Sequence, residues 1–194
     1  YIQLYGLLYS LDVAEDYLDG EIQYIYGKYP WRGGFSAVNF YHNLFVKMPR
    51  AYKPEIKSIQ YASPGFIELS QLVEVARDVA QIVGYVSAAI LAGNKTYSTI
   101  QKGISERKLS KINLRSEELS LLEKERVFIH KSVNDIARVM GIKPETLSKL
   151  YFRTENNELA VLKILSSVYR RARDLAKLQN QGKLDIKRDH IERR

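Results

Sequence analysis

The stretch from Leu72 to Ile90 constrains the fold more than any other part of the chain. Its apolar residues recur at the spacing of one helical face, and residues 79–94 carry no charge. A membrane span needs about 20 predominantly apolar residues, whereas this run is shorter and directly follows Arg77 and Asp78. We therefore expect a helix buried inside the protein, with membrane contact through 79–94 as the alternative.

Helical patterns continue along the rest of the chain. The sequence predicts a long helix over 117–140, a short helix after it, and a final helix from the capping residue Asn157 to Gln181. Four to five helices over 70–182 would form a bundle. The charged residues 183–194 are expected to fray.

The first third has a different pattern and is rich in tyrosine and glycine. Apolar and alternating residues predict strands at Ile2–Tyr9 and Glu21–Tyr26, and 36–48 has the spacing of a helix. Residues 55–61 and 66–69 predict a hairpin, because proline and glycine lie between them. We therefore expect an α+β, mainly α fold, in which a small N-terminal sheet with one or two helices occupies residues 1–69 and precedes the bundle.

Composition excludes several kinds of chemistry. With 45% hydrophobic and 27% charged residues, a chain of 194 residues is neither disordered nor an integral membrane protein by composition. The absence of cysteine excludes disulfides, zinc sites of the cysteine type, iron–sulfur clusters and thiol catalysis. It also leaves the redox compartment open, and the cytoplasm is the location that we expect by default.

The net charge of +8 is unevenly distributed along the chain. Acidic residues outnumber basic ones near the start, whereas the part after residue 100 is rich in lysine and arginine. Such polarity favours an acidic partner, such as nucleic acid or anionic lipid, and equally permits head-to-tail self-association. Charge alone therefore does not choose the partner.

Residues Asp135–Tyr151 have the layout of a helix-turn-helix. An alanine at 137 would let two helices approach, Gly141 would form the turn, and Ile142 follows it. This segment resembles the helix-turn-helix of transcriptional repressors of the lactose-repressor type, in which the second helix enters the major groove. The resemblance implies base or phosphate contacts by five residues, namely Arg138, Lys143, Thr146, Ser148 and Lys149. A plain helix break explains the same residues, since Pro144 and Glu145 suit any first helical turn.

The final helix carries a second candidate for binding anions. Its basic residues would line one flank of the apolar stripe, at Lys163, Arg170, Arg173 and Lys177. Such a flank can hold phosphates through charge without reading bases. The alternative is a solvated face that pairs with acids elsewhere.

Aromatic residues cluster in the first third and suggest an interface, at Tyr24, Tyr26, Tyr29, Trp31 and Phe35. Aromatics near arginine are enriched where proteins bind each other. Filling the core of a small sheet explains the same cluster equally well.

Catalytic patterns have little support in the sequence. His42, His130 and His190 lie far apart, and no glycine-rich phosphate loop or serine motif occurs. Four carboxylates share one helical side and could hold magnesium, namely Asp12, Glu15, Asp16 and Asp19. A solvated acidic face is the simpler interpretation.

Apolar stripes, rather than reactive groups, account for most of the pattern in this chain. We therefore expect a non-catalytic protein–protein interaction or assembly module with a basic helical half and no cofactor. A protein partner or self-association fits this expectation. The alternative is a DNA-binding regulator that uses residues 135–151, and a third hypothesis is an enzyme with a scattered site.

Overall fold

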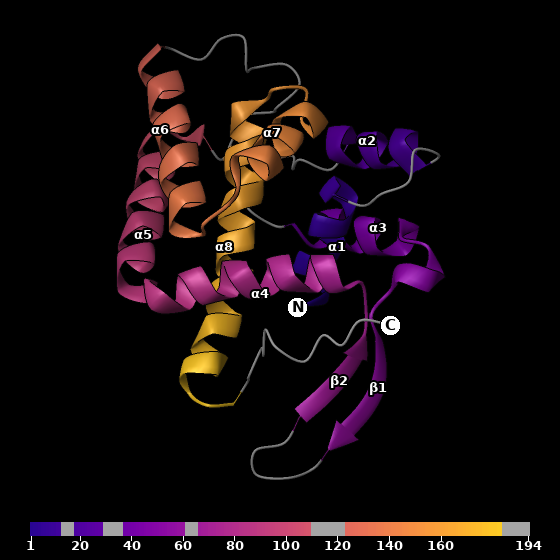
Figure 1. Ribbon diagram of the computed structural model, residues 1–194. Coiled ribbons are helices and arrows are strands. Elements are labelled where there is room, and N and C mark those ends of the chain that lie inside the picture. The colour runs from indigo at the N-terminus through magenta and orange to yellow at the C-terminus, as the bar shows by residue number, and fades with distance from the viewer. Residues whose placement is uncertain (13–17, 29–36, 61–65, 110–122, 184–194) are drawn as a thin grey trace.

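The computed structural model describes residues 1–12, 18–28, 37–60, 66–109 and 123–183. Within these ranges the chain forms eight α-helices, a short 3-10 turn and two strands (Figure 1). The helices are α1 (Ile2–Asp12), α2 (Asp19–Lys28), α3 (Val38–Lys47), α4 (Val73–Ala88), α5 (Ile90–Glu106), α6 (Glu123–Val139), α7 (Pro144–Arg153) and α8 (Glu158–Asn180). The 3-10 turn is η2 (Arg50–Tyr52), and the strands are β1 (Glu55–Gln60) and β2 (Phe66–Ser70). The predicted mainly-α class and the helical bundle are confirmed.

The helix α8 is the central element of the helical body. Asn157 caps its first turn, because its side chain accepts a hydrogen bond from the Ala160 backbone N–H at 2.8 Å. Every side chain from Leu159 to Tyr169 is buried. The helices α4 and α6 make the most extensive contacts with α8, and α5 packs on α6 (Figure 1). The final helix therefore begins directly after Asn157, as the sequence predicted.

The helix α1 is a second core element, and it corrects a prediction. The expected strand at Ile2–Tyr9 is wrong, because these residues are helical. Every residue from Leu4 to Leu11 is buried, and α3, α4 and α7 pack around the helix. A helix that is apolar on all sides has no polar face to show its period, so its sequence resembles that of a buried strand.

The second expected strand, Glu21–Tyr26, is also wrong, because it lies within α2. Its buried side chains are Ile22, Ile25 and Tyr26, which recur at helical spacing. Gly20 lies inside the first turn of α2.

The strands β1 and β2 form an antiparallel pair, which we call the ribbon. They occupy the two segments for which the sequence predicted strands, while the connecting residues 61–65 lie outside the described residues. Figure 1 shows the ribbon projecting away from the helices, and neither strand packs extensively on a described helix. The predicted N-terminal sheet with helices packed on it is therefore wrong.

One hydrophobic core joins the helices. The same cluster contains buried side chains of α1 to α3, which precede residue 70, and of α4 to α8, which follow it. Within the described part of the chain, no single helix is long and apolar enough to cross a membrane. Taken together, α4 and α5 have the required length and composition, but the two helices are bent by 92°.

Candidate interaction surfaces

The α6–α7 segment has the turn that the sequence predicted. Gly141 has a φ of +60°, a conformation that suits glycine, and it ends the helix α6. Its N–H donates to the Arg138 carbonyl at 3.1 Å, and the Ile142 N–H donates to the Ala137 carbonyl at 3.0 Å. These two bonds form a Schellman motif. A Cβ at Gly141 would lie 2.4 Å from the ring of Tyr85, so the turn also packs closely on α4.

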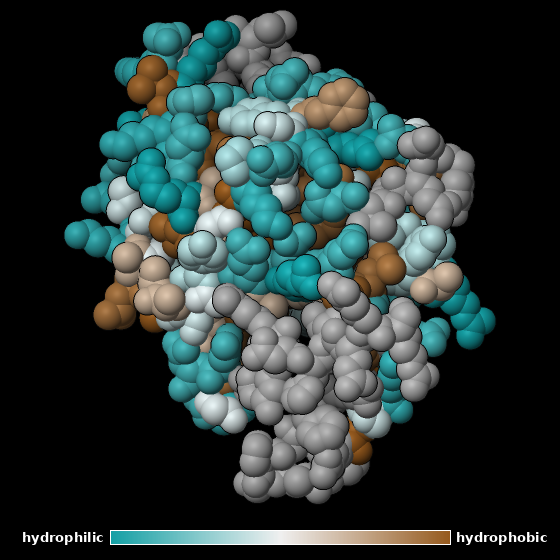
Figure 2. All heavy atoms as spheres, viewed as in Figure 1, coloured by the Kyte–Doolittle hydropathy of each residue, from teal (hydrophilic) through white to brown (hydrophobic). Residues whose placement is uncertain are grey.

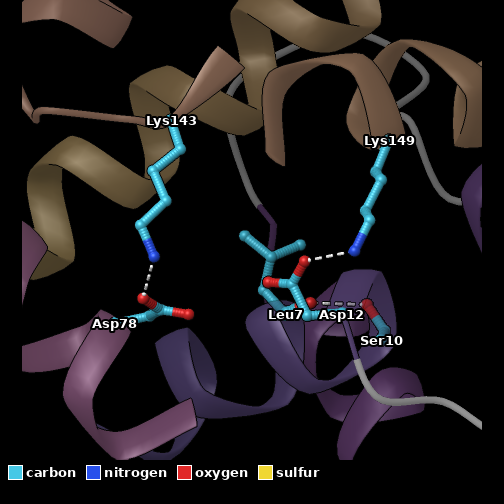
Figure 3. Close-up of polar contacts among 6 residues, drawn as sticks. All are labelled: Leu7, Ser10, Asp12, Asp78, Lys143 and Lys149. Atoms are coloured by element: carbon cyan, nitrogen blue, oxygen red, sulfur yellow. Dashed lines mark hydrogen bonds and ion pairs between the residues drawn. The ribbon is translucent and has the colours of Figure 1, made fainter. Parts of the chain in front are cut away.

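Two of the five residues predicted to contact DNA bind the protein itself. Lys143 Nζ lies 2.8 Å from Asp78 Oδ1 on α4, and Lys149 Nζ lies 2.8 Å from Asp12 Oδ1 at the end of α1. Figure 3 shows the two side chains pointing to these acids, that of Lys143 from the residue just before α7 and that of Lys149 from within α7. The hydrogen bond from Lys143 to Asp78 raises the pKa of the lysine. The two ion pairs therefore join the α7 region to α4 and to the end of α1.

The other three predicted contacts lie in different surroundings. Thr146 lines a cavity of about 20 Å³ among apolar side chains of α1, α4, α7 and α8. Such a volume holds about one water molecule. Ser148 is exposed, and so is Arg138, which pairs with Asp135 at 3.6 Å within its own helix. The face of α7 that carries Thr146 and Leu150 is thus packed against the body, while Ser148 lies at the surface.

The basic residues of α8 do not share one exposed flank. Lys163 is 0% exposed, and its Nζ has no hydrogen-bond partner in the described structure. Burial lowers the pKa of Lys163 to about 8. Lys177 is exposed, whereas Arg170 and Arg173 are half-buried.

Further along α8, arginines stack on tyrosines. The guanidinium of Arg171 lies 4.0 Å from the ring centre of Tyr41 on α3, and that of Arg173 lies 5.7 Å from the ring centre of Tyr97 on α5. Tyr97 in turn stacks on Tyr169, with ring centres 5.2 Å apart. These contacts join α8 to α3 and α5 through cation–π and aromatic packing. No pattern in the sequence distinguished Arg171 from the other basic residues of α8; in the structure its guanidinium also donates to the Ser167 carbonyl at 3.0 Å.

The predicted aromatic cluster divides between core and surface. Tyr26 is 1% exposed, packs edge-on against Phe40, and its hydroxyl lies 3.0 Å from Ser10 Oγ. Tyr24 is 58% exposed, and Lys28 donates a hydrogen bond to its hydroxyl at 2.6 Å. The remaining members, Tyr29, Trp31 and Phe35, lie outside the described residues. Core filling therefore accounts for Tyr26, and Tyr24 stays available to a partner.

Of the four carboxylates that could have held magnesium, the two that the structure describes pair with basic side chains. Asp12 pairs with Lys149, and Asp19 pairs with Arg153 at 2.5 Å. Glu15 and Asp16 lie outside the described residues. Among the residues that the structure describes, no group of three histidines or carboxylates is placed to hold a metal ion.

The ribbon presents an apolar face that was not among the surfaces predicted from the sequence. Ile56 lies opposite Leu69, and Ile59 lies opposite Ile67. Opposite residues share a face of the sheet, and Leu69 and Ile67 are two positions apart, so Ile56 and Ile59 also share one face. The bulge at Lys57 makes this possible, because it adds one residue between them. Ile56 is 61% exposed and Ile59 is 47% exposed.

Comparison with known proteins gives no independent indication of function. The chain matches no protein-family model, and it shows no significant similarity to a curated protein or to a solved structure.

Proposed function

We propose that this protein is a non-catalytic assembly module, in which the ribbon pairs with the ribbon of a second copy of the chain. The observation that carries the proposal is the exposed apolar face of Ile56 and Ile59 on a sheet that has two strands in the described part of the chain. An isolated two-stranded hairpin is marginally stable in water, and a third strand or a packed layer is needed for independent stability. Packing two ribbons face to face would supply such a layer.

Burial on assembly favours this pairing. Covering the exposed part of Ile56 and of Ile59 stabilises the complex by about 1 kcal/mol for each side chain. A twofold arrangement doubles this contribution, because each copy presents the same face. Each ribbon would then gain a shared apolar surface.

The contact between copies lies at the apolar face of the ribbon. The β1 edge carries features with which proteins block an edge strand, since Pro54 precedes β1 and Lys57 lies at its bulge. Pairing through the β2 edge would leave β1 on the outside of the joined sheet, with Ile56 and Ile59 uncovered. We therefore place the contact at the face, where the two ribbons pack on each other.

Sedimentation velocity over a range of protein concentrations tests this proposal. The wild-type chain should form a dimer as its concentration rises, and Ile59→Lys should shift the population to monomer. Val127→Lys is the matched control, because Val127 is 58% exposed on α6, away from the ribbon. A wild-type chain that stays monomeric at the highest concentration would contradict the proposal, and so would equal effects of the two variants.

DNA binding through α7 is a second candidate function. The α6–α7 turn has the expected order, and Ser148 and Arg138 are exposed. Lys143 and Lys149 would have to leave their ion pairs to reach phosphate. Titration of duplex DNA at several salt concentrations distinguishes the two functions, since phosphate contacts give a steep dependence on salt. A flat titration would remove this candidate.

A further inference from the structure

The corner between α4 and α5 carries the most exposed large apolar side chain of the described residues. Leu91 is 83% exposed and lies just after the bend, with the exposed Ala88 and Ala92 on either side of it in sequence. Figure 2 shows hydrophobic surface gathered at the left of the view, over this corner. Most of the apolar side of α4 is buried in the core. The exposed apolar surface is therefore concentrated at the bend.

The corner is held rigidly in place. A Cβ at Gly93 would lie 2.7 Å from the Tyr169 hydroxyl and 2.9 Å from a methyl group of Val139. The start of α5 thus packs against α8 and α6 at close range. Asn94 Oδ1 accepts a hydrogen bond from the same Tyr169 hydroxyl at 3.1 Å. Leu91 is consequently presented on a fixed support.

The end of α8 lies beside the corner and adds positive charge. Ser87 Oγ, in the last turn of α4, donates to Asn180 Oδ1 at 2.5 Å. The sequence has no acidic residue over 79–105 or over 175–183, but it has four lysines in these two ranges. Lys95, Lys177 and Lys183 are exposed. We call these three lysines, with Ala88, Leu91 and Ala92, the lysine corner.

We propose that the lysine corner docks on a membrane surface that contains anionic lipid. Lysines near an anionic bilayer each add to the attraction, and an exposed leucine can enter the boundary between headgroups and acyl chains. A protein partner fits this surface less well. Protein interfaces are enriched in arginine and aromatic residues and depleted of lysine, whereas the corner offers lysine, leucine and alanine. Such docking would place the ribbon and the rest of the chain at the membrane surface.

Co-sedimentation with vesicles tests this proposal. The wild-type chain should bind vesicles of phosphatidylcholine and phosphatidylserine, bind vesicles of phosphatidylcholine alone much more weakly, and dissociate at high salt. Leu91→Asp should weaken the partition coefficient by about tenfold or more. Removing the three exposed lysines together, as Lys95→Gln, Lys177→Gln and Lys183→Gln, should weaken it by about a hundredfold.

A matched control separates the corner from exposed apolar residues in general. Phe152 is 69% exposed on α7, so Phe152→Asp makes a similar change at a distant surface and should leave vesicle binding unaltered. Circular dichroism checks that each variant is folded. Absence of binding to anionic vesicles overturns the proposal, as does equal loss in Leu91→Asp and Phe152→Asp. If the lysine variant loses binding to poly-glutamate while the wild type ignores vesicles, the partner is an acidic protein and the membrane proposal is wrong.

Discussion

Lys163 offers the sharpest prediction about stability, because its amino group is buried without a partner among the described residues. Its side chain is 0% exposed, and burial lowers its pKa from 10.5 to about 8. At neutral pH the folded chain therefore carries an uncompensated charge in its core. Replacement of a buried charge by an apolar side chain of similar volume is often stabilising. We expect Lys163→Met to stabilise the protein.

The size and the pH dependence of this effect follow from the pKa. A fall from 10.5 to about 8 corresponds to about 3 kcal/mol of stability. Because the folded pKa is the lower one, the unfolded chain keeps its proton between about pH 8 and about pH 10.5 while the folded chain loses it. The free energy of unfolding of the wild type therefore rises with pH in this window. Below about pH 8 the full penalty is present.

Urea denaturation at about pH 7 and about pH 9.5 measures both effects. Lys163→Met should raise the free energy of unfolding by up to about 3 kcal/mol at the lower pH and remove most of the rise toward the higher pH. Lys177→Met, an exposed change on the same helix, should alter stability by less than about 0.5 kcal/mol. If Lys163→Met destabilises the protein, or if both proteins show the same pH dependence, the amino group is neutralised or hydrated and the reasoning is wrong.

Two further predictions concern the α6–α7 segment. Gly141→Ala should lower the free energy of unfolding by about 2 kcal/mol or more, because the φ of Gly141 is +60° and a Cβ would lie 2.4 Å from the Tyr85 ring. Gly182→Ala is the control, because Gly182 has a φ of +67° but a Cβ there would have no atom within 4 Å. In the same thermal melts the control should lower the free energy of unfolding by only about 1 kcal/mol. A double-mutant cycle on Lys149→Met and Asp12→Asn should give a coupling free energy of about 0.5–1 kcal/mol that falls at high salt. A coupling of zero would show that this ion pair does not hold α7 in place.

Periodicity in the sequence predicted the helices after residue 70 better than the elements before it. The helix α8 is indicated by three features of its sequence, namely an apolar stripe, the capping residue Asn157 and a polar opposite face. In α1 the residues from Leu4 to Leu11 are buried on all sides, so no polar face marks the period and a strand was the wrong interpretation. The prediction for α1 was wrong because the other helices bury it on all sides, and the sequence of α1 alone does not show this.

The candidate sites show a different limit of the sequence. Spacing placed Lys163 on the side of α8 that carries the other basic residues, but other parts of the chain cover that side at Lys163. The acids that pair with Lys143 and Lys149 are 65 and 137 residues away in the chain. No local sequence pattern could have shown that these lysines pair with these acids. The ribbon face was hidden for a similar reason, because regular alternation would place Ile56 and Ile59 on opposite faces and only the bulge at Lys57 brings them together.

The most direct test of the central claim is hydrogen–deuterium exchange of the ribbon at low and high protein concentration. Our account predicts that the backbone amides of β2, Phe66–Ser70, exchange more slowly as the concentration rises, while those of α8 are unchanged. This result would show that a second copy covers the ribbon. Exchange of β2 that is rapid and identical at both concentrations would contradict the account.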